Sequence, residues 1–171
     1  EVWSIIFLSL RVSLIATTIA LVLGVPLGAL LALTRFPGHA LAVGGVYAGM
    51  GLPPIVAGLI VSVLLWRNGP FGALGLLYSP VAMIIAQALI ATPVVAALSF
   101  SAIHALDPRY RLQLKALGAS QVQTAWWLLR EARLPLIAAV VAGFGAVISE
   151  VGAAMMVGGN IKGETRVLTT A

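Results

Sequence analysis

Four long apolar stretches restrict the fold of this chain more than any other feature of its sequence. A transmembrane helix needs about 20 mostly apolar residues, because about 30 Å of hydrocarbon is crossed at about 1.5 Å per residue. The predicted spans cover residues 3–34, 40–66, 80–105 and 134–157. We therefore expect an all-α polytopic membrane protein in which residues 1–171 form a single transmembrane domain. A fifth span is expected to begin near residue 167, where a charged stretch gives way to apolar residues.

Composition excludes most other classes of protein. The chain is 61% hydrophobic and 9% charged, whereas soluble domains average about 45–50% and about 25%. It contains no cysteine, which excludes disulfides, thiolate metal sites and cysteine nucleophiles. The net charge of +5 would suggest a nucleic-acid partner in a soluble protein, but in a membrane protein the positions of Lys and Arg indicate orientation instead. We therefore expect a lipid membrane and no nucleic acid among the partners.

The distribution of Lys and Arg predicts which end of the molecule faces the cytoplasm. Residues 35–39 and 106–133 lie two spans apart, and therefore on the same side of the membrane. Together they contain six of the ten Lys and Arg residues. Because cytoplasmic loops carry the excess of positive charge, the sequence predicts that residues 106–133 are cytoplasmic.

Glycines and prolines predict how the spans pack and bend. Gly24 and Gly28 form a GxxxG pattern, as do Gly45 and Gly49, and this spacing lets helix backbones approach closely. The residues expected to kink their helices are Pro26, Pro53, Pro54 and Pro93. Four spans are too few to enclose a polar route comfortably, which favours an oligomer.

Residues 106–133 contain the most informative local signals. Asp107 and Pro108 predict a helix start, because Asp accepts hydrogen bonds from the first amides and Pro fits the first helical position. Gly118 predicts a break, since glycine readily adopts the left-handed conformation, and Ser120 is suited to cap a second helix over residues 121–132. The sequence therefore predicts a short helix–turn–helix at the membrane surface.

The same segment resembles the cytoplasmic motif of permease subunits from ABC importers. The matching residues are Leu117-Gly118-Ala119-Ser120, Thr124, Trp126 and Leu134-Pro135. Where that family often has Glu-Ala-Ala, this chain has Leu112-Gln113-Leu114. In the family the motif forms a coupling helix that docks on the ATPase, which implies a type I ABC importer-like fold with four to five spans. The resemblance places the ATPase contact at Lys115, Ala116, Leu117, Gly118, Ala119, Ser120, Val122 and Thr124.

The carboxy-terminal region resembles the tungstate-type permeases within that family. The matching residues are the run from Ile148 to Ile161, Thr165-Arg166 and Leu168-Thr169-Thr170. Molybdate permeases tend to have Glu-Phe-Gly where this chain has Glu150-Val151-Gly152, and sulfate permeases are more distant. The resemblance implies ATP-driven import of a small oxyanion, tungstate first, with molybdate and then sulfate as alternatives.

The resemblance also implies a set of partners. They are two copies of a cytoplasmic ATPase subunit, an extracytoplasmic oxyanion-binding protein and a second copy of this chain, in the inner membrane of a prokaryotic cell. The chain has no phosphate-binding loop, so ATP would be hydrolysed by the partner and not by an enzyme activity of its own. No catalytic residue or cofactor is expected. No metal site is expected either, because His39 and His104 have no carboxylate at metal-ligand spacing.

Glu150 is the only acidic residue inside a predicted span. A carboxylate in hydrocarbon costs on the order of 2–3 kcal/mol, which favours a structural or gating role. We expect Glu150 either to pair with a cation or to accept backbone hydrogen bonds near a bend at Gly152, with a protonated glutamate as the alternative. Direct contact with substrate is disfavoured, because the carboxylate would repel an oxyanion. The pathway or gate candidates are Glu150, Gly152, Met155, Gly159 and Asn160.

Alternatives to these interpretations stay open. Gly159 and Asn160 also fit an ordinary helix terminator. An intramembrane enzyme is disfavoured, because no serine and histidine lie at matching depth in the predicted spans. A structural or assembly protein would use the same glycine-rich packing, but only a transporter needs residues 109–130 to bind a nucleotide hydrolase.

Overall fold

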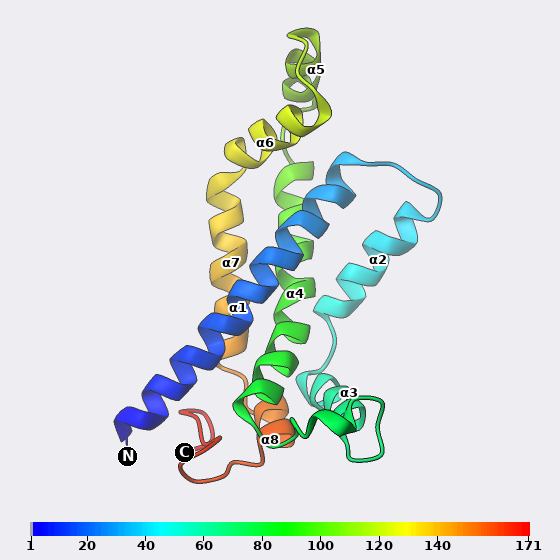
Figure 1. Cartoon of the computed structure of the whole chain (residues 1–171). Coiled ribbons are helices and arrows are strands. Elements are labelled where there is room, and N and C mark those ends of the chain that lie inside the picture. Colours follow the sequence, from blue (N-terminus) through cyan, green and yellow to red (C-terminus); the bar gives the residue numbers. More distant parts are fainter. Residues whose placement is uncertain (1) are drawn as a thin grey trace.

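The computed structural model describes residues 2–171, and within that range it is helical and contains no β-strand. Its elements are α1 (Val2–Leu33), α2 (His39–Met50), α3 (Pro54–Leu65), the 3-10 helix η1 (Gly72–Leu74), α4 (Pro80–His104), α5 (Pro108–Ala116), α6 (Gln121–Glu131), α7 (Arg133–Ile148) and α8 (Gly152–Gly158). Figure 1 shows an elongated bundle with α5 and α6 at one end, and with α3, α8 and the end of the chain at the other. The predicted all-α class is confirmed.

Two helices, α1 and α4, are each long and apolar enough to cross a membrane. Two further pairs, α2 with α3 and α6 with α7, qualify only when each pair is taken together, and they are bent by 100° and 71°. By length and composition, the described residues therefore contain between two and four candidate spans.

The predicted span over residues 40–66 is two helices and not one. Helix α2 ends at Met50 and α3 begins at Pro54, with a bend of 100° between them. Proline lacks the N–H donor and its ring clashes with the preceding turn, but it fits the first position of a new helix. Pro53 and Pro54 therefore separate two helices instead of kinking one.

Two other prolines do not end their helices, and the last predicted span is interrupted at the bend expected near Gly152. Pro26 and Pro93 lie inside α1 and α4, whose helical assignment continues through them. Neighbouring helices in a membrane protein compensate for the lost hydrogen bonds, so such prolines are tolerated. The span predicted over residues 134–157 is instead interrupted without a proline, because α7 ends at Ile148 and α8 begins at Gly152.

The centre of the fold is the close crossing of α1 and α4. A β-carbon at Gly24 would lie 2.9 Å from the carbonyl oxygen of Thr92, and one at Gly28 would lie 2.5 Å from that of Ala96. The first GxxxG pattern therefore has the close packing that its spacing predicts. The second pattern is close at only one of its glycines: a β-carbon at Gly49 would lie 3.0 Å from Cβ of Pro93, whereas within the described residues nothing lies within 4 Å of one at Gly45.

Replacing Gly28 by alanine should lower the free energy of unfolding in detergent by about 1–3 kcal/mol, because the added methyl overpacks against α4 backbone. Gly45→Ala is the matched control, since it makes the same change in a helix where the structure leaves open space. The two unfolding free energies are compared in titrations with a denaturing detergent. Equal stabilities for the two variants would contradict the packing described here.

Candidate functional site

The helix–turn–helix predicted within residues 106–133 is present as α5 and α6. The N–H of Arg109 donates to Oδ1 of Asp107 at 2.9 Å, and Pro108 is the first residue of α5. Both starting signals therefore act as the sequence predicts.

The turn between the two helices is closed by its own backbone. Gly118 has φ of +81°, the N–H of Ala119 donates to the carbonyl of Leu114 at 3.0 Å, and the N–H of Gly118 donates to that of Lys115 at 3.0 Å. These two bonds form a Schellman motif, which needs a left-handed residue at the glycine position. Ser120 and Gln123 then form a capping box at the start of α6. The local chemistry thus holds α5 and α6 in one defined turn.

The structure separates the predicted ATPase-contact residues into exposed and buried groups. Leu117 is 83% exposed and Val122 is 79% exposed, at the end of the molecule that Figure 1 places farthest from α8. A groove of about 530 Å³ is lined by Leu114, Leu117, Gly118, Ala119, Gln123 and Trp127. Lys115, Ala116 and Ser120 are exposed as well, whereas Thr124 is buried. Exposed apolar side chains beside a groove are suited to contact another protein.

Arg111 was not singled out by the sequence pattern, yet it joins this segment to the rest of the fold. Its Nη2 donates to the carbonyl oxygen of Leu33, the last residue of α1, at 2.6 Å. The final carbonyls of a helix lack partners within the helix, and a cation is favoured there. His39 also contacts this end, with Nε2 2.6 Å from the carbonyl oxygen of Leu31. No local signal predicts the Arg111 contact, because Arg111 and Leu33 are far apart in sequence.

The second group of candidate residues lies at the other end, where α7 and α8 are separated. Glu150 is only 8% exposed. Its Oε1 accepts a hydrogen bond from the N–H of Ala153 at 2.8 Å, and its main-chain carbonyl accepts one from Oγ1 of Thr169 at 2.9 Å. Of the two contacts expected for this side chain, the backbone hydrogen bond is therefore present, at the start of α8.

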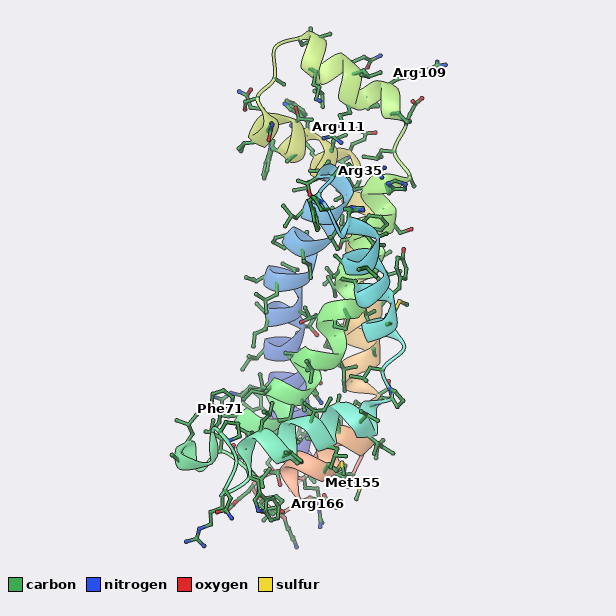
Figure 2. The ribbon with its side chains drawn as sticks, turned by 90° about the vertical axis from the view of Figure 1, so that its right-hand side faces the viewer. Arg35, Phe71, Arg109, Arg111, Met155 and Arg166 are labelled. Atoms are coloured by element: carbon green, nitrogen blue, oxygen red, sulfur yellow. The ribbon has the colours of Figure 1, made fainter. Side chains whose placement is uncertain are left out.

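Gly152 and the residues around it hold α8 tightly against α3. A β-carbon at Gly152 would lie 2.8 Å from Cγ1 of Ile55, and one at Gly58 would lie 2.8 Å from the Cα of Ala153. Met155 is exposed and lies at this end of the molecule in Figure 2. The α3–α8 contact is thus close, with a methionine of α8 facing outward.

Gly159 and Asn160 end α8 in a turn. Both have positive φ, +71° and +51°. Oγ1 of Thr165 donates to the carbonyl of Gly158 at 2.5 Å, and Nε of Arg166 donates to Oδ1 of Asn160 at 3.4 Å. This geometry fits the helix-terminator interpretation and leaves the gate interpretation as a proposal.

Gln87 is a further residue that the sequence analysis did not select. It lies in α4, is 3% exposed, and its Nε2 donates to the carbonyl of Val147 at 3.5 Å. With Glu150 and Ser13 it lines a narrow cavity beside the end of α7. The sequence signal that could have identified this residue is a glutamine in the middle of an apolar span.

The chain is similar to known membrane transport proteins. The family model described as "Binding-protein-dependent transport system inner membrane component" matches residues 24–170. The tungstate uptake system permease protein TupB of Peptoclostridium acidaminophilum is 43% identical over 100% of this chain and 75% of its own length. A probable anion ABC transporter permease protein of Haloferax volcanii is 38% identical over 98% of this chain and 75% of its own length. The molybdenum transport system permease protein ModB of Escherichia coli K12 is 28% identical over 99% of this chain and 77% of its own length.

Proposed function

Because the chain belongs to the family of binding-protein-dependent transport system inner membrane components, we propose that it is the membrane subunit of an ATP-driven importer of tungstate. The observation that supports tungstate is the 43% identity to a tungstate permease across the whole chain, against 28% to a molybdenum permease. Family membership also favours transport over a structural or assembly role. The chain itself acts as a non-catalytic permease subunit.

We infer that the exposed turn between α5 and α6 binds the ATPase subunits. The exposed side chains of Leu117 and Val122 and the adjoining groove support this contact. Because the turn is braced by the Schellman motif and by Arg111 on α1, movement of a docked ATPase would be passed to the helix bundle and not lost in a flexible loop.

We infer that the oxyanion passes between two copies of the chain, with the α8 end facing the extracytoplasmic binding protein. The excess of Lys and Arg at the α5–α6 end supports this orientation. Glu150, Gly152, Met155, Gly159 and Asn160 lie at the opposite end, around the start and end of α8. A short helix separated from α7 is suited to move when the bundle opens, so we assign these residues to the gate.

Transport by the complete system, reconstituted in vesicles with its ATPase and binding protein, tests the substrate. Labelled tungstate should accumulate inside the vesicles only when ATP is enclosed together with the ATPase and the binding protein is outside. Unlabelled tungstate should compete better than molybdate, with sulfate weakest. Preferred uptake of molybdate would identify molybdate, and not tungstate, as the substrate. ATP-independent accumulation would contradict the importer mechanism.

A further inference from the structure

A cavity of about 500 Å³ lies where the end of α1 meets α5 and α6. Pro26 and Leu30 of α1 form one wall, and Arg111 and Lys115 of α5 form another. The start of α6, including Thr124, completes the lining. Figure 2 shows both Arg111 and Arg35 at this end of the bundle. The cavity adjoins the groove beside Gly118 that we assign to the ATPase: Ala119 lines both, and the ATPase-contact candidates Lys115, Val122 and Thr124 also line the cavity.

The polar part of the cavity is positively charged. Among the described residues, its lining includes Arg111 and Lys115 and no Asp or Glu. Gln121 and Val122, the first residues of α6, also line it. The amino-terminal end of a helix has partial positive charge and favours anions. Two cations and a helix start therefore converge on one space.

Two buried polar atoms of the lining lack a partner. Nε of Arg111 and Oγ1 of Thr124 have no hydrogen-bond partner within the described residues. Thr124 is itself only 5% exposed. Buried donors are nearly always hydrogen-bonded in folded proteins. Both atoms are covered by protein in this structure, so a group in the cavity would reach them only after a small side-chain movement, and the oxygens of a phosphate group are then suited acceptors.

The remaining lining is apolar and distinguishes a lipid from a small ion. Pro26, Leu30 and Leu33 extend from the charged region along α1. A free oxyanion would leave this surface uncovered, whereas the acyl chain of a phospholipid would cover it. The combination of a cationic end and an apolar wall thus favours an amphiphilic anion.

We propose that this cavity binds an anionic membrane phospholipid, with its phosphate between Arg111, Lys115 and the start of α6, and its acyl chain along Pro26 and Leu30. The inference rests on the orientation given under the proposed function, which places the cavity at the cytoplasmic leaflet, where anionic lipids attract basic segments. A lipid bound here would join α1 to α6 and support the turn that meets the ATPase.

Native mass spectrometry of the assembled transporter, delipidated and then titrated with phosphatidylglycerol or phosphatidylcholine of equal chain length, tests this site. Phosphatidylglycerol should bind more tightly, and Lys115→Gln should weaken it about fivefold, as expected for one charge near the membrane surface. Arg109→Gln is the matched control, because Arg109 is exposed on the same helix and does not line the cavity. Circular dichroism of both variants checks that they are folded.

Four results would overturn the lipid site. They are equal binding of the two lipids, equal effects of the two variants, displacement of lipid by millimolar inorganic phosphate or tungstate, and absence from the assembled transporter of a lipid that the permease alone binds in a parallel titration. The third would identify a site for a free oxyanion, and the fourth a surface covered by protein. Because lipid binding is measured without transport, failure of tungstate uptake with the lipid still bound would count against the proposed substrate alone.

Discussion

Gly118→Arg is expected to reduce the ATPase that co-purifies with the chain by about tenfold or more, equivalent to about 1.4 kcal/mol of binding free energy. Gly118 has φ of +81°, a conformation that costs other L-residues about 1–2 kcal/mol. It also lines the exposed groove with Leu117 and Trp127. Arginine would strain the turn and put a long charged side chain into the proposed contact. The measurement is the ATPase-to-permease ratio after affinity purification from detergent-solubilised membranes.

Gly118→Asn tests whether a short side chain is tolerated at this turn when the left-handed backbone is only weakly strained. Asparagine tolerates the left-handed conformation, and within the described residues nothing lies within 4 Å of a β-carbon at this position. This variant should therefore keep most of the ATPase. Normal retention by the arginine variant would reject the placement of the contact, whereas equal loss from both variants would assign the effect to the side chain and not to backbone strain.

The parts of this site that sequence could predict are those determined by neighbouring residues. Asp107 and Pro108 start a helix, Gly118 ends it and Ser120 caps the next one, and each effect involves partners within five residues. Capping and left-handed glycine are local chemistry, so they can be inferred from the order of residues alone.

The parts that sequence could not predict depend on contacts between distant segments. The prolines at 53 and 54 predicted a kink, but the complete break and the 100° direction of α3 accompany its packing on α8, where Gly58 meets Ala153. In the sequence, Arg111 is one of several basic residues in its segment. Only the structure shows that its side chain donates to the carbonyl of Leu33. Such roles follow from tertiary packing and leave no periodic signal.

Glu150 combines a contact that the sequence could predict with a partner that only the structure identifies. Its replacement is expected to have the second large effect, on tungstate uptake. Its isolation among apolar residues predicted a backbone or ionic partner, and the structure supplies the N–H of Ala153. Glu150→Gln keeps an oxygen that can accept this bond but removes its charge. Hydrogen bonds to charged groups exceed neutral ones by about 1 kcal/mol, so we expect tungstate uptake to fall about fivefold while ATPase co-purification is unchanged.

Glu150→Ala should have a larger effect, because it leaves the buried N–H of Ala153 without this acceptor. An unsatisfied buried donor costs about 1–3 kcal/mol, so both uptake and the stability of the α7–α8 region should fall. Ser149→Ala is the matched control, since the Ser149 hydroxyl is exposed and donates only to carbonyls of its own helix. Uptake is measured in reconstituted vesicles at equal permease content. If Glu150→Gln transports like the unmodified chain while Glu150→Ala does not, the oxygen is needed to form α8 and the charge has no part in gating.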